Sequence, residues 1–248
     1  MRSLPMALLL VAPLALVSAC HVGGSSSGKS EAKASGTQGS KSFALTGFDQ
    51  VSLKGPDDVV VKVGPAFSVT AAGDTGLIDE LEIIVDGSAL KIGRKSHHGL
   101  NWSSGDRSVT ITVTMPAIKA AAVAGSGDMA VDTVTGDFAA SVAGSGDLKV
   151  AQVTGPKVDV NVAGSGEAEL AGTADTLSIS IAGSGSVEAK GLRAKDLKVS
   201  IAGSGAVAAT ADVTADVTLM GSGDVDVHGA AKCKTTKVGS GDVRCNLA

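Results

Sequence analysis

The chain has 248 residues, and its 21 basic and 25 acidic side chains give a net charge of −4, which argues against a nucleic-acid-binding protein. Four Phe and one Trp are its aromatic residues, whereas it contains 33 Gly. This composition fits thin β-strands joined by many turns better than helices packed around a bulky core.

The N-terminal segment, residues 1–19, is predicted to be a secretory signal peptide. Arg2 precedes an apolar run over residues 4–17 that is too short to cross a bilayer comfortably and that ends in small residues. Val17-Ser18-Ala19-Cys20 resembles the bacterial lipobox, which implies that the Cys20 thiol is lipidated and that cleavage makes Cys20 the first residue. The alternative is ordinary cleavage after Ala19, which would leave Cys20 as a free thiol in an oxidising compartment.

Residues 20–41 are predicted to be a lipid-anchored, disordered linker. After Cys20 this stretch is rich in Gly, Ser, Lys, Ala and Thr and has no apolar periodicity, so it cannot offset the entropy lost on ordering. Flexible-chain scaling gives it a root-mean-square reach of about 25 Å.

Residues 42–118 show short runs of alternating apolar residues at irregular spacing. The runs lie at 51–53, 59–63, 81–85, 90–92 and 109–113. We interpret the region as the first, irregular coils of a solenoid or as a β-rich cap on its open edge, with a separate N-terminal domain as the alternative.

The second half of the chain, residues 119–248, repeats the tripeptide Gly-Ser-Gly seven times, with spacings of 19, 20, 19, 20, 18 and 18 residues. A fixed period of this size is typical of a solenoid, in which each unit buries its apolar face by stacking on its neighbours. The glycines predicted to form the repeated turns are Gly125, Gly127, Gly144, Gly146, Gly164, Gly166, Gly183, Gly185, Gly203, Gly205, Gly221, Gly223, Gly239 and Gly241.

Apolar and polar residues alternate on both sides of each tripeptide, as in Val158, Val160 and Val162 before one copy and Leu148 and Val150 after another. Period two indicates half-buried strands, so each repeat is expected to hold two strands and two turns. Coils spaced by about 4.8 Å would make a rod of roughly 30 to 35 Å. The predicted fold is all-β, a right-handed parallel β-helix with coils of 18–20 residues, because a propeller blade needs about twice this period.

Glycine suits the turn because a sharp corner requires positive φ, and serine can hydrogen-bond the local backbone or its copy in the next coil.

Two cysteines fall on inward positions of the last repeat. Cys233 stands where earlier coils have Phe138 or Val158, and Cys245 stands where they have Val131 or Val150. We expect both side chains to point inward from opposite walls and to form a disulfide in an exported protein, worth about 3 kcal/mol on the chain-entropy model. Two buried thiols or a metal pair is the alternative.

An acidic residue follows the tripeptide in five copies: Asp128, Asp147, Glu167, Asp224 and Asp242. A calcium-binding β-roll uses Gly-rich repeats with Asp, but Ser186 and Ala206 interrupt this series and one Gly-rich corner serves a whole coil. We interpret the acidic positions as a solvated edge that discourages aggregation, and we predict no cofactor.

The sequence carries no legible catalytic motif. No copy of the tripeptide is followed by the Lys-Ser/Thr pair of a phosphate loop, and no Ser-His-Asp or Cys-His order is recognisable. Paired Asp residues could serve glycoside hydrolysis, but stacked coils bring such pairs together by repetition alone. His97, His98 and Trp102 cluster in the long interruption at 93–108, which we expect to be an exposed loop rather than a ligand site.

Several of these features together resemble a bacterial envelope family named putative auto-transporter adhesin, head GIN domain. The resemblance covers residues 43–246 and rests on Leu45-x-Gly-Phe-x-x-Val51, the runs at 59–63, 81–85 and 109–113 with Pro116, and the repeated Gly-Ser-Gly-Asp. It implies a right-handed parallel β-helix on an exported, often lipid-anchored protein without catalytic residues to carry over.

The expected function is that of a non-catalytic cell-envelope lipoprotein with a β-helical adhesion or display module. The alternatives are a periplasmic structural or scaffold lipoprotein and, third, a polysaccharide-active enzyme. The expected partners are the membrane, through the N-terminal lipid, and an envelope protein or surface polymer; a homo-oligomer stays open. His21 after Cys20 favours the outer membrane by resemblance, because an Asp there retains some lipoproteins in the inner membrane.

Overall fold

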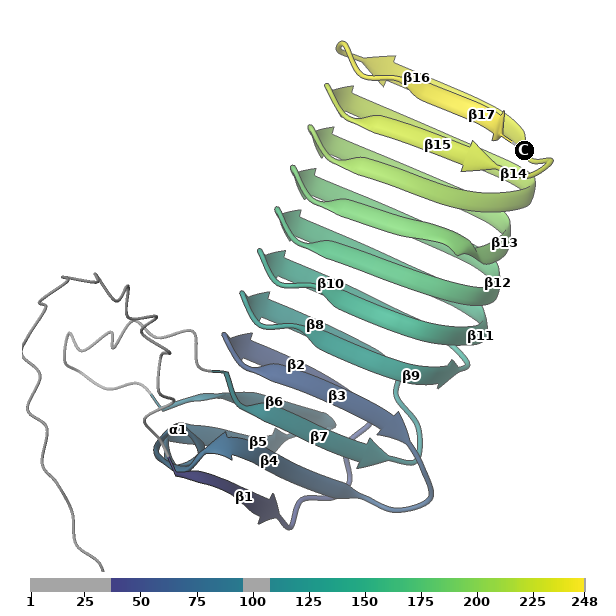
Figure 1. The fold of residues 1–248 in the computed structure, drawn as a ribbon. Coiled ribbons are helices and arrows are strands. Elements are labelled where there is room, and N and C mark those ends of the chain that lie inside the picture. Colours follow the sequence, from purple (N-terminus) through teal and green to yellow (C-terminus); the bar gives the residue numbers. More distant parts are fainter. Residues whose placement is uncertain (1–36, 96–107, 248) are drawn as a thin grey trace, which may run out of the picture. The chain divides into compact units, whose positions relative to one another are not determined.

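The structure is a computed structural model that describes residues 37–95 and 108–247 (Figure 1). Its elements are β1 (Gln38–Phe43), β2 (Gln50–Gly55), β3 (Asp58–Val63), β4 (Ser68–Asp74), α1 (Thr75–Glu80), β5 (Leu81–Asp86), β6 (Ala89–Arg94), β7 (Thr110–Met115), β8 (Ala120–Gly125), β9 (Met129–Thr135), β10 (Phe138–Gly144), β11 (Leu148–Gly164), β12 (Glu167–Gly183), β13 (Ser186–Gly203), β14 (Ala206–Gly221), β15 (Asp224–His228), β16 (Lys232–Val238) and β17 (Val243–Leu247).

Parallel strands stack coil upon coil from β8 to the C-terminal end (Figure 1). We call the side formed by strands before each tripeptide wall A and the side formed by strands after it wall B. On wall A, Val142, Val162 and Ile181 stand in register in three successive coils, and all three are buried. Residues that alternate with them face solvent, which confirms the period-two prediction and the all-β, parallel β-helical fold.

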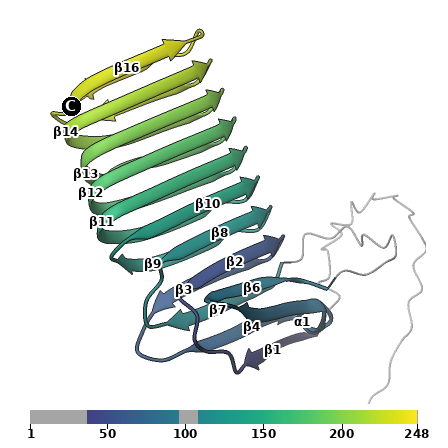
Figure 2. The same cartoon turned by 180° about the vertical axis from the view of Figure 1, so that it is seen from behind.

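The turn opposite the tripeptide is smooth enough that one strand continues around it. β11, β12, β13 and β14 therefore each include a wall B strand and the following wall A strand (Figure 2). Register shifts at this second turn, for example between Glu169 and Gly172, absorb the difference between 18-, 19- and 20-residue repeats.

The regular stack begins earlier in the sequence than the first Gly-Ser-Gly. β2 pairs in parallel with β8, with Gly55 opposite Gly125, and β3 pairs in parallel with β9. β2 and β3 thus form a complete coil, which we call the first coil. It stacks on the coil of β8 and β9, although 64 residues separate Gly55 from Ala120 in the chain.

Below the first coil, the chain reverses direction to build a cap. β4 is antiparallel to β7 and β5 is antiparallel to β6, while α1 joins β4 to β5 with the Asp74 carboxylate capping its N-terminus. β6 and β7 then fill the space between this reversed layer and the first coil, pairing in parallel with β2 and β3 (Figure 1). The region 42–118 therefore combines a regular coil with an antiparallel cap.

The predicted linker, residues 20–41, extends too far, because the folded part already begins before residue 41. β1 starts at Gln38 and pairs antiparallel with β4 from Gln38 opposite Asp74 to Phe43 opposite Val69. Pairing with β4 satisfies backbone groups that the polar sequence could not order on its own. Residues 38–41 thus belong to the cap.

The core is one narrow column of aliphatic side chains between the two walls. It runs from Phe48 and Leu81 near the cap through Ile179 to Val227 near the other end. A fully buried aliphatic side chain contributes about 1.5–3 kcal/mol, so many small contributions of equal kind, rather than a few large aromatics, hold the coils together.

Candidate functional site

The Gly-Ser-Gly corner is the most regular feature of the surface, and its two glycines have different roles. The first glycine of every copy has φ between 123° and 136°, as predicted for a sharp corner. The second glycine does not have positive φ; a Cβ atom there would lie 1.8–2.6 Å from a carbonyl oxygen of the preceding coil. Close approach of two backbones, not conformation, excludes side chains at this second position.

The serine between them joins the coils through its backbone. Its N–H donates to the carbonyl of the first glycine in the preceding coil, at N to O distances of 2.8–3.2 Å in all seven copies. The serine side chain is left on the surface of the corner, as for Ser126. This bond between coils is made by the main chain, so it does not test the hydrogen bond expected of the serine hydroxyl.

The acidic residue after the tripeptide is a structural acceptor. Asp128 Oδ1 accepts the Asp147 N–H at 2.9 Å, and Asp147 Oδ1 accepts the Glu167 N–H at 3.0 Å. Asp224 Oδ1 likewise accepts the Asp242 N–H at 3.0 Å. We call this series of carboxylate-to-backbone bonds the aspartate ladder.

The ladder is interrupted wherever the residue is not Asp. After Glu167, Ser186 and Ala206, the N–H of the next coil donates instead to the carbonyl of the second glycine, at 3.1–3.2 Å. The expectation of a merely solvated acidic edge is therefore incomplete, because the Asp carboxylates bind backbone N–H groups. Among residues 37–95 and 108–247, no group of three His, Cys, Asp or Glu side chains could hold a metal ion.

One further copy of the corner escaped the sequence prediction. Gly55-Pro56-Asp57-Asp58 occupies the corner of the first coil. The Asp57 carbonyl oxygen lies where a Cβ atom on Gly127 would be, just as the carbonyl oxygen of each second glycine closely approaches the second glycine of the next coil. Asp58 starts the aspartate ladder, with Oδ1 accepting the Asp128 N–H at 3.4 Å. The signal available in the sequence was a Gly followed by Asp three residues later and then by a run of valines.

Asp57 takes the place of a glycine because the layer below it has no Gly-Ser-Gly corner. Its carboxylate is fully buried and accepts bonds from Arg94 Nε at 2.9 Å, Arg94 Nη2 at 2.7 Å and the Val109 N–H at 3.0 Å. The hydrogen bond with Asp57 raises the pKa of Arg94. The Asp57 carboxylate thus binds Arg94 and Val109, which lie on the two sides of residues 96–107 in the sequence.

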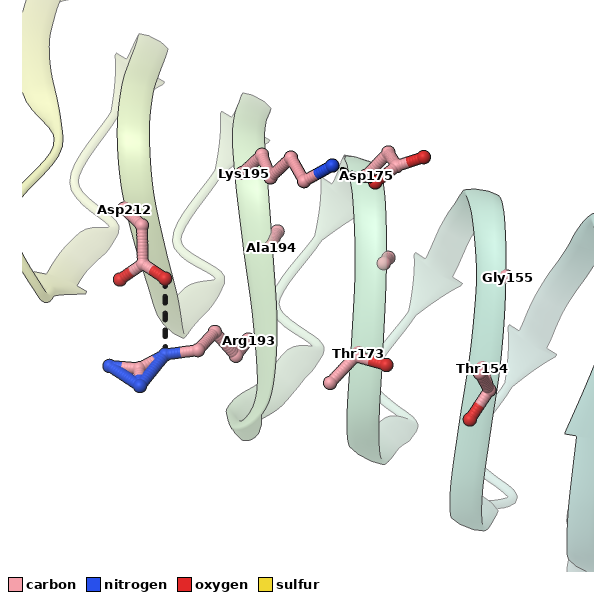
Figure 3. A pocket seen from close by; sticks show the side chains of 9 residues that line it. Thr154, Gly155, Thr173, Asp175, Arg193, Ala194, Lys195 and Asp212 are labelled. Atoms are coloured by element: carbon pink, nitrogen blue, oxygen red, sulfur yellow. Dashed lines mark ion pairs between the residues drawn. The ribbon is translucent and has the colours of Figure 1, made fainter.

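A shallow groove of about 460 Å³ crosses four coils at the second turn (Figure 3). It is hollow because Gly155, Ala174 and Ala194 are small, and it is lined besides by Thr154, Thr173, Asp175, Arg193, Lys195 and Asp212. Thr154 and Thr173 stand in register in neighbouring coils, and Arg193 continues their row.

The charges of the groove neutralise one another in pairs. Arg193 Nε lies 3.1 Å from Asp212 Oδ2, and Lys195 Nζ lies 2.7 Å from Asp175 Oδ1 (Figure 3). The hydrogen bond to Asp175 raises the pKa of Lys195, so this ammonium stays charged and is no general base. The groove can offer hydrogen bonds to a polar ligand, but its groups are not arranged for proton transfer.

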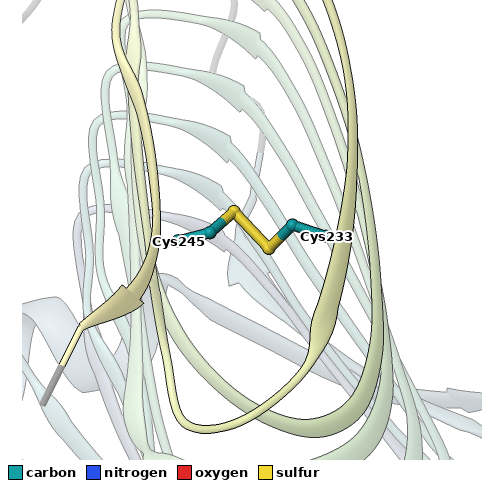
Figure 4. The surroundings of a disulfide bond; sticks show 2 residues. All are labelled: Cys233 and Cys245. Atoms are coloured by element: carbon teal, nitrogen blue, oxygen red, sulfur yellow. A yellow bond between two sulfur atoms is a disulfide. The ribbon is translucent and has the colours of Figure 1, made fainter.

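Cys233 and Cys245 form a disulfide across the last coil, as predicted, with their Cα atoms 6.5 Å apart (Figure 4). Cys20 and the residues His97, His98 and Trp102 lie outside the described residues. Within the described part of the chain, no helix is long and apolar enough to cross a membrane.

These features define the class of protein: a parallel β-solenoid with a glycine corner, an antiparallel cap and a disulfide-closed last coil. The family described as putative auto-transporter adhesin, head GIN domain, matches residues 47–231. The chain belongs to this family, which confirms the resemblance seen in the sequence. A comparison with curated proteins finds no match.

Solved structures share the fold. A putative adhesin from Bacteroides fragilis is 20% identical with a TM-score of 0.75, covering 84% of this chain and 97% of that one. A putative lipid binding protein from Parabacteroides distasonis is 25% identical with a TM-score of 0.65, covering 85% and 97%. A putative adhesin from Parabacteroides merdae is 17% identical with a TM-score of 0.68, covering 85% and 97%.

Proposed function

We propose that the protein is a cell-envelope lipoprotein, anchored through Cys20, that holds a rigid β-solenoid for adhesion or display. The observation that carries the proposal is the arrangement of the solenoid's ends. The chain from Cys20 enters the folded part at β1, in the cap, while the lateral walls and the last coil lie further along the stack. Membership of a family described as adhesins supports the same role.

The second candidate is a periplasmic scaffold lipoprotein, which needs the same anchor and the same rigid body but a different side of the membrane. Catalysis is not supported, because the groove pairs its charges and offers no nucleophile with an adjacent base. Lipid binding, the description of the P. distasonis structure, is not favoured by a groove lined by two ion pairs and two threonines.

Anchoring is tested by replacing Cys20 with Ala. We expect wild-type protein to incorporate radiolabelled palmitate and to fractionate with membranes, and C20A to lose both properties while keeping the circular dichroism of the β-solenoid. A Ser18→Thr variant, which leaves the thiol in place, is the matched control. Equal membrane association of C20A and wild type would contradict the anchor.

The side of the membrane is tested with a single surface thiol. Ser180 is exposed on wall A in the middle of the stack, and Cys233 and Cys245 are already bonded to each other. Ser180→Cys should react with a membrane-impermeant maleimide on intact cells if the solenoid is displayed. Reaction only after permeabilisation would select the periplasmic scaffold, and a known periplasmic thiol protein controls for leakage.

A further inference from the structure

The last coil differs in charge from the rest of the solenoid. Residues 232–247 contain Lys232, Lys234, Lys237 and Arg244 but a single acid, Asp242. The coil before it, residues 214–231, contains three Asp and no Lys or Arg. The C-terminal end of a chain with net charge −4 is therefore basic.

The last coil also has polar residues at inward positions. Thr235 stands in register with Val217, and Lys237 stands in register with Leu219. The Lys237 ammonium donates to the Gly241 carbonyl at 2.8 Å. Because this end does not present the aliphatic column, a partner would meet polar side chains and backbone rather than an apolar surface.

Both strands of the last coil lie at an edge of the sheet that the described residues form. Within the described residues, β16 pairs with β14 alone and β17 pairs with β15 alone, so each has backbone N–H and C=O groups on its outer side without a strand partner. The Cys233–Cys245 disulfide ties the two edges together, which lowers the entropy lost when a ligand orders them.

Asp242 continues the aspartate ladder at this edge. Its N–H is bound by Asp224 Oδ1, and its own carboxylate stands where the equivalent Asp147 carboxylate accepts the N–H of a following strand. At the edge, the Asp242 carboxylate contacts Arg244 Nη2 at 3.4 Å. Acceptors that bind a further coil inside the stack are thus present at its end.

We propose that this C-terminal edge, the outer side of β16 and β17, binds an extended acidic segment of another envelope protein by β-strand addition. The inference rests on the proposed envelope location for its partner and goes beyond it in naming the site and the chemistry. Unpaired backbone groups select an extended peptide, because an anionic polymer without amides would leave them unsatisfied.

The lysines select the charge of that peptide. Lys232 and Lys234 are exposed on the outer face of β16, and neither has an acidic side chain within ion-pair distance among the residues that the structure describes. Lysine on an edge discourages pairing with apolar strands and with the same edge of a second copy. Glu or Asp at alternate positions of an incoming strand would instead stand opposite these ammonium groups.

The test uses a fluorescent peptide that alternates Glu and Val over about eight residues, the length of an ordinary strand. One control peptide alternates Lys and Val, and a second has the acidic sequence with a central Pro, which cannot continue a strand. We expect the mature, disulfide-bonded full chain to bind the acidic peptide alone, with slower hydrogen exchange in β16 and β17 on binding.

A charge-reversal pair locates the site. Lys232→Glu with Lys234→Glu should weaken binding by about tenfold or more, because two attractive cross-strand contacts become repulsive. Lys157→Glu with Lys198→Glu changes the net charge equally on wall A away from the edge and should bind as wild type.

Equal binding of the Pro-containing peptide would show charge attraction without strand addition and overturn the proposal, as would absence of binding or insensitivity to Lys232→Glu/Lys234→Glu. Self-association that competes with the peptide would assign the edge to a second copy and overturn it too. None of these results changes palmitate incorporation or thiol labelling, so failure here is distinguishable from failure of the anchor or of display.

Discussion

At the scale of single residues, the two glycines of each tripeptide separate two reasons for excluding a side chain. The first combines positive φ with close approach, and the second has close approach alone. Gly136 has positive φ without close approach, since its φ is 97° and the space where a Cβ atom would lie is open. These three sites allow conformation and contact to be measured separately.

We expect Gly136→Ala to lower the free energy of unfolding by about 1–2 kcal/mol, the cost of a left-handed backbone with a side chain. Gly146→Ala should cost more than about 3 kcal/mol, because its Cβ would stand 2.1 Å from the Gly127 oxygen and the coils would have to separate. Gly144→Ala should cost the most. Urea denaturation of the three variants checks the order, and equal costs for Gly136→Ala and Gly146→Ala would contradict it.

The aspartate ladder predicts a small effect at an apparently important position. Asp147→Ala removes the acceptor of the Glu167 N–H, but the structure shows at Ala206 that the next N–H can bond to the second glycine carbonyl instead. The variant should therefore lose less than about 1.5 kcal/mol. Asp147→Asn, which keeps Oδ1, is the control and should lie close to wild type in the same denaturation experiment.

Asp57 is the opposite case, because its buried carboxylate accepts three hydrogen bonds at once. Asp57→Ala leaves Arg94 and the Val109 N–H without this partner in a buried setting, so we expect a loss of about 3 kcal/mol or more in thermal and chemical unfolding. Asp175→Ala removes an exposed ion pair and should change stability by less than about 1 kcal/mol. Similar losses in the two variants would refute the structural role of Asp57.

At the scale of elements, the terminal coil is the one whose stability depends on a covalent bond. β16 has Cys233 half-buried and its other residues exposed, and among the strands that the structure describes it pairs with β14 alone. The disulfide closes a loop with a sequence separation of 12, so it limits the freedom of both edge strands in the unfolded coil.

Reduction should therefore loosen this end before the rest. We expect Cys233→Ser with Cys245→Ser to destabilise the last coil by about 3 kcal/mol on the chain-entropy model. Hydrogen exchange should accelerate in β16 and β17 and stay unchanged in β8 and β10, because each coil contacts only its neighbours. Uniform acceleration along the stack would show that the bond stabilises the whole solenoid cooperatively.

The same scale shows what sequence could and could not predict. Alternation and the fixed period are local signals, and they correctly placed Cys233 and Cys245 on facing walls. The cap depends on pairings such as β6 between β2 and β5, which join segments without any shared pattern. Gly55-Pro56-Asp57-Asp58 was missed because its glycine position holds an Asp that only the layer below explains.

At the scale of the whole molecule, stability is distributed over many equivalent layers. Ile179 lies in a central coil and is 1% exposed. Its neighbours in register are Val160 in the preceding coil and Val199 in the following coil, both of them buried aliphatic residues as well. A cavity in one central layer interrupts the contacts that link the two halves of the stack.

Ile179→Ala should accordingly cost about 2–5 kcal/mol and broaden the unfolding transition, as the halves lose cooperativity. Differential scanning calorimetry with hydrogen exchange on both sides of the site measures this. Ser180→Ala, on the outward face of the same strand, should leave the transition unchanged, and a sharp single transition in Ile179→Ala would contradict the layered picture.

Because β6 and β7 lie between the first coil and the cap, the stack can be completed only in a certain order during synthesis. β2 and β3 are synthesised well before their partners, which are completed only when the chain has passed β7, at Met115, and then β8 and β9. From that point every new coil meets a finished template and adds to it in one direction, until the disulfide closes the last. Growth in this direction needs only the coil before as a template, because each coil contacts only its neighbours.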